Sequence, residues 1–420
     1  MTAFRASSSD GDVRPADPAR AAVSRLAELS RQFIGDLDFS IHTSFDTVES
    51  EWRDFARHAE CTPFQTVEWL TAWHRHVGRR DGVVPVIVVG RFADGATALI
   101  APLAVEPRRR LRRLCWLGQK LSDYNAPLLA RDFSQRVTPD RFLAFWRELL
   151  KRLQSDAALR FDWIEFEKMP QTIGVQINPF VGLGVIANAD SAHITQLAEN
   201  WEAFYRAKRS SATRRHDRAK RRHMAEFGEI RFVTAAPDDI EETLDLLWRQ
   251  QSQIFARKGV HDIFARPGYR ELFCDFAANP RTRHLAHVSR VDIGTTCAAV
   301  NFAVMFGDCY YHVLSSYCGG QLTRYGPGAL HLRELLAYAI KLGLRRFDFM
   351  IGDEQYKLQW CDLRLNLFDY SRAATWRGWP ASALSTARRR VKRFIKQTPR
   401  LWRLVRRLRS VAGPLINPQT

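Results

Sequence analysis

The sequence predicts an α/β protein that contains two similarly built domains. Helical and strand-like segments alternate along the chain, and they follow the same order in both halves. An internal repeat supports this, because "VGRFADGATALIAPLAV" (89–105) aligns without gaps to "VSRVDIGTTCAAVNFAV" (288–304). Each copy is typical of a strand, a tight turn and a strand, with Asp-Gly or Ile-Gly at the bend. β-Meanders can resemble one another by chance, but the constant offset favours a duplicated domain.

The length and composition agree with a soluble two-domain protein. The 420 residues exceed one ordinary core, and no apolar run reaches the ~18 residues that a membrane-spanning helix needs. The start of the chain is polar and lacks the apolar stretch of a secretory signal, so residues 1–36 are expected to form a disordered leader. The seven cysteines are scattered and include no Cys-x-x-Cys pair. This pattern indicates a reducing cytoplasm and argues against a disulfide framework, a zinc site or another metal.

Periodicity places the main helices and strands. In the first half we expect helices within 45–77 and at 141–153, and strands at 83–92 and 161–169. In the second half we expect helices at 238–259 and 269–278, and a strand at 309–318. The strongly basic segment 201–228 is interpreted as one connecting helix. The predicted organisation is therefore a leader at 1–36, a first domain at 37–195, a basic connection at 196–228, a second domain at 229–375 and a basic tail at 376–420.

A Gly-rich turn follows the strand at 309–318 and leads into an amphipathic helix. The buried stripe of this helix has i, i+3, i+4, i+7 spacing and consists of Leu332, Leu335, Leu336 and Ala339. Gly343 is placed to end the helix, and "RRFDFM" (345–350) returns as a strand, which predicts a βαβ unit. In the turn "RYGPGA" (324–329), the glycines let backbone N–H groups approach a ligand, and the helix start attracts anions. The turn is a candidate phosphate site, although a simple tight turn with a helix cap would have the same pattern.

The same turn resembles the pyrophosphate loop of the GNAT acyltransferase fold, whose pattern is Arg/Gln-x-x-Gly-x-Gly/Ala. This chain has Thr323 at the first position, with Arg324 one residue later. The run "FDFMIGDEQYKLQW" (347–360) resembles the Asp-Phe-x-x-Gly-Asp-Glu-x-Tyr-Lys block of the CelD-like GNAT subfamily of cellulose and polysaccharide biosynthesis. Segments 62–73 and 118–129 resemble blocks of that family's first half, and the Fem-type transferases are more distantly similar. The resemblance covers roughly residues 40–375. It implies tandem GNAT-like domains, each a mixed central sheet flanked by helices.

The resemblance implies acyl transfer from a thioester such as acetyl-CoA to an amine or a hydroxyl. The CoA pyrophosphate would lie on the loop, and the pantetheine arm would pair with the preceding strand, so the expected donor-binding residues are Val313, Ser315, Arg324, Tyr325, Gly326, Pro327, Gly328 and Ala329. Only the second half carries this loop. The first domain is therefore expected to serve the acceptor or the architecture.

The polar cluster after the last strand of the βαβ unit offers groups for proton transfer. Glu354 or Asp353 could take a proton from the acceptor, and Tyr356 or Lys357 could protonate the departing thiolate. A solvated loop that only positions the acceptor would have the same composition. The residues expected to bind the substrate are Asp123, Tyr124, Trp69 and Asp348. The histidines at 74, 76, 312 and 331 lack metal-ligand spacing, so structural or surface roles are expected for them.

The net charge of +18 is concentrated in the tail, because no acidic residue occurs from Ser371 onward. Residues 387–409 predict two short basic amphipathic helices, with Val391, Phe394 and Ile395 on one face of the first. Such helices favour the surface of an anionic membrane. RNA is a competing but less favoured partner. Packing of the tail on the protein's own acidic face is a third interpretation.

These observations favour an acyl-CoA-dependent transferase that modifies an envelope or polysaccharide precursor in the cytoplasm, at the inner face of the plasma membrane. A Fem-type transferase that takes its acyl group from aminoacyl-tRNA is the alternative enzyme. A non-catalytic accessory protein of polysaccharide synthesis is a third hypothesis. The departure at Thr323 favours this third hypothesis, whereas the intact Gly-Asp-Glu-x-Tyr-Lys block opposes it.

Overall fold

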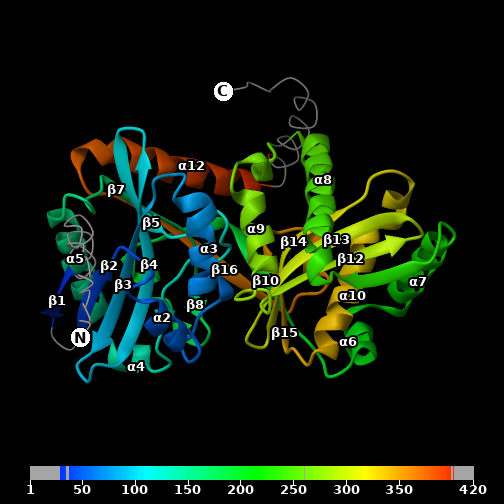
Figure 1. Cartoon of the computed structure of the whole chain (residues 1–420), viewed down its shortest axis with the longest axis horizontal. Coiled ribbons are helices and arrows are strands. Elements are labelled where there is room, and N and C mark those ends of the chain that lie inside the picture. The colour runs from blue at the N-terminus through cyan, green and yellow to red at the C-terminus, as the bar shows by residue number, and fades with distance from the viewer. Residues whose placement is uncertain (1–28, 35–36, 260, 399–400, 402–420) are drawn as a thin grey trace, which may run out of the picture.

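One large mixed sheet organises the molecule. The computed structural model describes residues 29–34, 37–259, 261–398 and 401. The sheet has 14 strands in the order β1-β2-β3-β4-β5-β7-β16-β10-β15-β14-β13-β12-β11, with β6 paired to β4. Strands of the first half and strands of the second half lie at opposite ends of it, and helices flank both parts (Figure 1). Among the described residues, no helix is long and apolar enough to cross a membrane.

The elements of the first half follow the predicted alternation, except that residues 29–34 form a strand paired with β2, which corrects the expected disordered leader at 1–36 for these residues, while residues 1–28 lie outside the described part of the chain. They are β1 (Leu29–Ile34), β2 (Leu37–His42), α2 (Glu49–Ala56), α3 (Val67–Trp73), β3 (Val84–Phe92), β4 (Thr97–Arg108), β5 (Leu111–Trp116), β6 (Leu128–Leu129), α4 (Phe133–Arg136), α5 (Pro139–Ser155) and β7 (Trp163–Pro170). A small hairpin, β8 (Thr172–Ile173) and β9 (Gln176–Ile177), follows them. Helix α5 forms because Thr138 caps its first turn, Pro139 occupies the first helical position, and Phe142, Phe145 and Leu149 fall on one buried face.

The second half repeats this order. Strand β10 (Ile186–Gln196) ends the first half, and the elements that follow are α6 (Trp201–Lys208), α7 (Ser211–Ala225), β11 (Ile230–Thr234), α8 (Ile240–Lys258), α9 (Tyr269–Ala278), β12 (Ala286–Ile293), β13 (Thr296–Phe306), β14 (Cys309–Tyr317), α10 (Pro327–Lys341), β15 (Arg346–Ile351), α11 (Gln355–Leu358), β16 (Leu363–Ala373) and α12 (Trp379–Gln397). The basic segment 201–228 was expected to be one helix, and this expectation was wrong. The chain is extended at Arg209, and the Ser210 side chain caps a new helix, α7.

The internal repeat corresponds to two equivalent hairpins. Its first copy forms β3 and β4, and its second copy forms β12 and β13, both antiparallel. Gly95 and Gly294 lie at the two bends with φ of +84° and +58°, a region in which glycine is favoured. Each hairpin is followed by a parallel crossover, β5–α5–β7 in the first half and β14–α10–β15 in the second. The predicted βαβ unit is therefore confirmed, and a second one occurs in the first half.

Two central strands are exchanged between the halves. Strand β10, which ends the first half of the sequence, pairs with β15 of the second half. Strand β16, near the end of the second half, pairs with β7 of the first half. The two strands also pair with each other, from Ile186 opposite Asp369 to Ile194 opposite Leu363. This exchange makes the sheet continuous.

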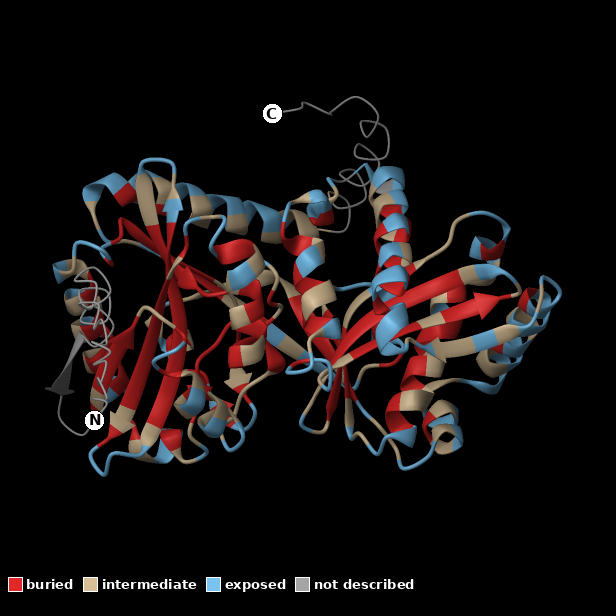
Figure 2. Cartoon of the chain, viewed as in Figure 1, coloured by how far each residue is buried: buried red, intermediate tan, exposed pale blue. Residues whose placement is uncertain are grey.

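A shared aromatic core joins the halves on one face of the sheet. Helix α3 of the first half packs on α9 of the second, and the Trp69 ring lies 5.2 Å from Phe276 and 6.0 Å from Phe273. Phe64 contacts Tyr311 of β14 with ring centroids 6.4 Å apart. Figure 2 shows buried residues along the central strands of both halves. The relative placement of the two halves is therefore fixed by apolar burial.

The described part of the basic tail is helix α12, which packs on β7, β10 and β16. The third interpretation of the tail is thus confirmed for this helix. The guanidinium of Arg389 contacts Glu165, Glu167 and Asp369 at 2.6 to 2.9 Å. The second predicted amphipathic segment, beyond Leu401, lies outside the described residues.

Candidate functional site

The two strands of the second crossover diverge and leave a gap in the sheet. Strands β14 and β15 pair in parallel only from Cys309 to Tyr311, opposite Arg346 to Asp348. Beyond this point β14 continues to Tyr317 along β13, and β15 continues along β10. Their facing edges are therefore not paired with each other, and a ligand can approach the strand backbone there.

The Gly-rich turn lies at one end of this gap. Gly326 has φ of +74°, and Pro327 occupies the first position of α10. A Cβ at Gly328 would lie 3.2 Å from the Tyr317 ring, so the close packing between the turn and β14 favours glycine at this position. The first turn of α10 leaves backbone N–H groups without helical acceptors and carries the positive end of the dipole. The turn therefore has a geometry that an anion can use, and its role as a phosphate site stays a prediction.

A pocket of about 350 Å³ opens between the turn, β14 and the segment after β15. Its lining combines glycines, aromatic rings and two arginines, namely Arg209, His312, Ser315, Tyr317, Thr323, Gly326, Pro327, Gly328, Ala329, Leu332, Arg333, Tyr356, Gln359 and Trp360. We call it the splay pocket. Five of the eight residues predicted to bind the donor line it, the exceptions being Val313, Arg324 and Tyr325.

The three exceptions lie elsewhere. Val313 packs against the core shared by the two halves. The Arg324 guanidinium lies 4.7 Å from the centre of the Tyr325 ring, and that ring stacks on His223 of α7. Neither Arg324 nor Tyr325 lines the splay pocket, so their predicted role in donor binding stays a prediction.

Two arginines that the sequence did not single out give the splay pocket positive charge. Arg333 Nη1 lies 3.3 Å from Asp217 Oδ1, and Arg209 Nη2 lies 3.9 Å from Asp217 Oδ2. Arg209 also lies over the Trp360 ring, at 4.7 Å from its centre. Because two guanidinium groups share one carboxylate, the local charge stays positive, which favours a phosphate-bearing ligand.

His312 also lines the splay pocket, although a structural or surface role was expected for it. Burial, with a contribution from the charge of Lys357, lowers the pKa of His312 to about 3. The imidazole is therefore neutral at physiological pH and carries one N–H donor. A neutral imidazole that faces a pocket can donate a hydrogen bond to a carbonyl oxygen.

The members of the Gly-Asp-Glu-x-Tyr-Lys block occupy different environments. Tyr356 lines the splay pocket, and burial together with the charge of Glu354 raises the pKa of its hydroxyl. Lys357 is buried, donates to the carbonyls of Met350 and Ile351 at 3.2 and 2.9 Å, and lies 3.0 Å from Glu354. Its ammonium thus holds the end of β15. Of the four residues of the block predicted to be catalytic, only Tyr356 is placed where it can reach a ligand in this pocket.

The two carboxylates of the block lie outside the lining of the splay pocket. Asp353 accepts a hydrogen bond from the buried His193, with 2.9 Å between Oδ1 and Nε2. Although partial burial opposes it, the hydrogen bond from His193 and the charge of Arg364 lower the pKa of Asp353. Asp353 is therefore ionised at neutral pH. The roles of Asp353 and Glu354 as bases stay predictions.

Three of the four residues predicted to bind the substrate lie at a buried junction between the halves. The Tyr124 hydroxyl of the first half donates to Asp348 of β15, at 2.9 and 2.7 Å from its two carboxylate oxygens. Burial raises the pKa of Asp348 to about 7. Trp69 is fully buried and donates to Ser122 at 3.2 Å, whereas Asp123 faces Lys168 at 3.6 Å. In this conformation Trp69, Tyr124 and Asp348 are closed to solvent.

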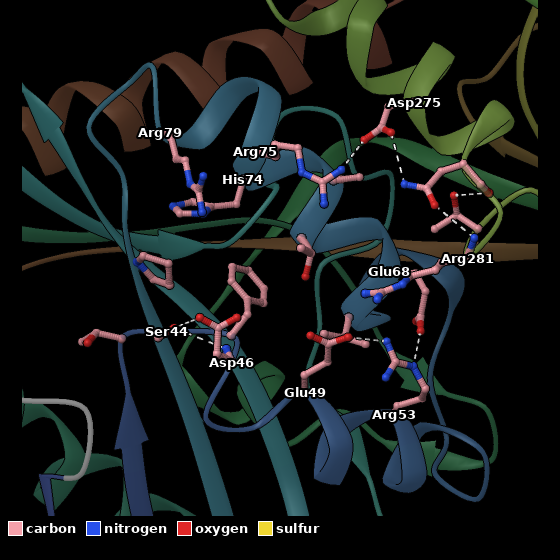
Figure 3. Close-up of a pocket in the computed structure, with 18 residues that line it drawn as sticks. Ser44, Asp46, Glu49, Arg53, Glu68, His74, Arg75, Arg79, Asp275 and Arg281 are labelled. Atoms are coloured by element: carbon pink, nitrogen blue, oxygen red, sulfur yellow. Dashed lines mark hydrogen bonds and ion pairs between the residues drawn. The ribbon is translucent and has the colours of Figure 1, made fainter. Parts of the chain in front are cut away.

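A separate polar groove lies between the halves, on the face that carries α2, α3 and α9. It consists of two adjoining cavities of about 390 and 890 Å³, which share Glu49, Arg53, Glu68 and Arg281. In Figure 3, Arg53 bridges Glu49 and Glu68, and Arg75 contacts Asp275 of α9. The larger cavity reaches Tyr311 on β14. Consecutive strand residues point to opposite faces of a sheet. Tyr311 therefore lines the groove on one face of β14, and the adjacent His312 lines the splay pocket on the other face.

Comparison with known proteins defines the class of this site. Residues 211–358 match the family model of the acetyltransferase (GNAT) domain. This part of the chain is a GNAT-type acyltransferase domain, and the protein is an acyltransferase. Within the described part of the chain, no cluster of His, Cys, Asp and Glu has the arrangement of a metal site. A search of curated proteins gave no match.

Solved structures of similar fold extend over most of the chain. FemX is 10% identical, with 80% of this chain and 97% of FemX covered and a TM-score of 0.53. A conserved protein of unknown function from Bacteroides thetaiotaomicron is 12% identical, with 78% and 98% covered and a TM-score of 0.49. A tandem GNAT protein from the clavulanic acid biosynthesis pathway is 12% identical, with 81% and 99% covered and a TM-score of 0.44. With the family match and the sheet described above, the likeness to FemX confirms the predicted tandem GNAT-like α/β fold.

Proposed function

We propose that the protein transfers an acyl group from an acyl-CoA, such as acetyl-CoA, to an amine or hydroxyl of an envelope or polysaccharide precursor. The observation that carries this proposal is the splay pocket, which combines a helix N-terminus and two arginines with a neutral histidine and a protonated tyrosine. The CelD-like subfamily and the class of acceptor rest on the sequence blocks at 62–73, 118–129 and 347–360.

The charges of the splay pocket support a division of roles along it. Arg209, Arg333 and the N–H groups of the first turn of α10 would bind the phosphates of the donor. His312 would donate a hydrogen bond to the thioester carbonyl oxygen, on which negative charge develops as the acceptor attacks. Tyr356, whose raised pKa keeps it protonated, would give its proton to the departing thiolate as the carbon–sulfur bond breaks.

The groove between the halves supports a separate entry for the acceptor. It reaches β14 on the face opposite the splay pocket, so an acceptor in it would approach the thioester through the gap between β14 and β15. Its proton would pass to Asp353 or Glu354, which lie two and three residues after the end of β15. The double variant Asp353→Asn with Glu354→Gln tests this step, because full turnover in that variant would remove both carboxylates from the mechanism.

The first test is calorimetric titration of acetyl-CoA and CoA into the full chain. We expect micromolar binding that weakens about tenfold in an Arg209→Gln, Arg333→Gln variant, since two of the contacts to the phosphates are lost. Arg206→Gln is the matched control, because Arg206 is an exposed cation of α6 outside the splay pocket. Equal weakening in both variants would indicate general attraction of polyanions to a basic protein. No binding at all would oppose a CoA donor.

Helix α7 favours one alternative donor, an aminoacyl-tRNA as in the Fem-type hypothesis. Arg215, Arg218, Arg221 and Arg222 are exposed on this helix, which follows Arg209 of the splay pocket. An RNA backbone would bind such a row, and its affinity would fall steeply with salt. Binding of charged tRNA that is lost when these four arginines are replaced by glutamine, together with no binding of CoA, would favour this donor.

An acceptor of the envelope would be met at the cytoplasmic face of the plasma membrane. We therefore propose that the protein works in the cytoplasm and associates peripherally with that membrane. The excess of basic residues after Ser371 supports this location.

A further inference from the structure

Helix α12 is amphipathic, but its polar side faces the protein. Arg389 forms ion pairs with Glu165 and Asp369 at 2.8 and 2.9 Å. One turn later, Lys392 lies 3.2 Å from Asp190. These contacts fix which side of the helix rests on β7, β10 and β16, and they leave the opposite side to solvent.

The opposite side of α12 is apolar. Leu384, Val391 and Phe394 lie along it with spacings of seven and three residues, which is one stripe of an α-helix, and they are 50%, 56% and 64% exposed. At the start of the helix, Trp376 and Trp379 are 86% and 66% exposed. Figure 2 shows most of α12 as exposed or intermediate along its outer side. We call these five residues the α12 stripe. Such a concentration of exposed apolar side chains on one element indicates an interaction surface.

Cations flank the α12 stripe. Arg388 and Arg390 are exposed and fall on its two sides, and Arg377 is exposed between the two tryptophans. No acidic residue occurs anywhere from 371 to 420. The surface is thus apolar at its centre and positively charged at its edges.

We infer that the α12 stripe docks on the surface of an anionic lipid bilayer, with the helix axis parallel to the membrane plane. Tryptophan and phenylalanine would enter the boundary between headgroups and acyl chains, while the flanking arginines reach the lipid phosphates. A second copy of the chain would bring like charges together, and RNA would leave the apolar centre uncovered. An anionic bilayer can both cover the apolar centre of the surface and pair with the arginines at its edges.

This inference differs from the expectation based on the sequence. That expectation placed the membrane-binding residues within 387–409, whereas the α12 stripe begins at Trp376 and excludes Arg389, which binds the protein itself. The inference stands whether the acyl donor is a CoA thioester or an aminoacyl-tRNA, because the α12 stripe lies outside the splay pocket and the groove.

The test is co-sedimentation of the full chain with vesicles of phosphatidylcholine containing 30% phosphatidylglycerol. The stripe variant is Leu384→Asn, Val391→Asn and Phe394→Asn. We expect its partition coefficient to fall at least tenfold. We expect Arg388→Gln with Arg390→Gln to lower the coefficient roughly fivefold per arginine at low salt. The control is Val175→Asn with Ile177→Asn, which removes two similarly exposed apolar residues (83% and 68%) from the β8–β9 segment.

Each outcome decides the inference. Loss of binding in the stripe variant, with binding kept in the control and with unchanged melting temperatures and CoA affinity, would support it. Equal binding of the stripe variant and the wild-type chain would overturn it and assign any membrane affinity to other basic residues. A wild-type chain that stays off the vesicles would also overturn it. Sedimentation velocity of the same samples would then show whether the α12 stripe instead joins two copies.

Discussion

The two crossovers share a topology but differ in what fills them. In the second, the space between β14, β15 and α10 is the splay pocket. In the first, the space beside β5, β7 and α5 is occupied by Phe180, which is fully buried with its ring 4.9 Å from Trp116 and 5.7 Å from Phe166. The comparison teaches that two crossovers of the same topology can differ in packing, since one leaves a pocket where the other is filled by a buried aromatic side chain.

Replacement of the buried Phe180 should have the largest effect. We expect Phe180→Ala to lower the free energy of unfolding by about 3 to 5 kcal/mol, because a well-packed ring leaves a cavity. Denaturant unfolding measures the loss, with Val175→Ala as an exposed control. The affinity for acetyl-CoA should not change. If the variant gained a second CoA site, the first crossover would be a blocked donor site instead of a structural unit.

A substitution of His312, which lines the splay pocket of the second crossover, tests the other side of the comparison. We expect His312→Phe to lower kcat by about 10²- to 10³-fold with little change in KM, as for the loss of one donor to an oxyanion. His312→Asn keeps an N–H donor and should recover part of the rate. Steady-state kinetics with acetyl-CoA and a model amine provide the measurement. A loss confined to KM would assign His312 to binding of the ground state.

The buried pair of Tyr124 and Asp348 tests the junction between the two regions. We expect Tyr124→Phe to lower the free energy of unfolding by about 1.5 to 3 kcal/mol at pH 8, where the hydroxyl bonds an ionised carboxylate, and by less at pH 5. Unfolding in urea at the two pH values measures this difference. An equal loss at both would show that the carboxyl of Asp348 does not titrate between them.

The wild-type chain should show a related dependence on pH. Asp348 keeps its proton up to about pH 7 in the folded state, whereas the unfolded chain releases it near 3.9. The folded state therefore binds more protons between these values, and this carboxyl makes the free energy of unfolding fall as pH rises from about 4 to 7. In Asp348→Asn this contribution should be missing from the pH profile.

Gly328→Val should have the smallest effect. The added side chain meets the Tyr317 ring, because a Cβ alone would lie 3.2 Å from it. We expect the Kd for acetyl-CoA to rise about tenfold, which corresponds to about 1.4 kcal/mol. Gly182→Val controls for the general effect of a β-branched side chain, because a Cβ at Gly182 meets no atom within 4 Å and its φ, like that of Gly328, lies outside the left-handed region. Unchanged CoA affinity in Gly328→Val would move the phosphate site away from this turn.

Local patterns predicted much of the second half. The turn at 324–329 and the helix after it were recognised from glycine positions and from the leucine stripe, both of which are properties of neighbouring residues. Arg209 and Trp360 were missed because distant parts of the chain bring them to the splay pocket. The prediction that Lys357 is catalytic failed to foresee its surroundings for another reason. Its ammonium group donates hydrogen bonds to two backbone carbonyls at the end of β15. Sequence composition alone does not distinguish these uses.

The exchange of strands was not predictable either. The patterns of β10 and β16 indicate strands but not their partners, because register and pairing depend on contacts between distant residues. The predicted bounds 37–195 and 229–375 describe the order of the chain, and they remain a proposal about domains. The sheet itself continues across them.

Because of this exchange, the two halves of the enzyme cannot be separated or swapped as independent units. A fragment cut at 229–375 would carry β16 without its partners β7 and β10, and it would expose the edge of β15 that β10 covers. Unpaired edges of this kind are templates for aggregation. A hybrid that takes its first half from another protein must therefore keep β10 paired with β15 and supply a matching partner for β16.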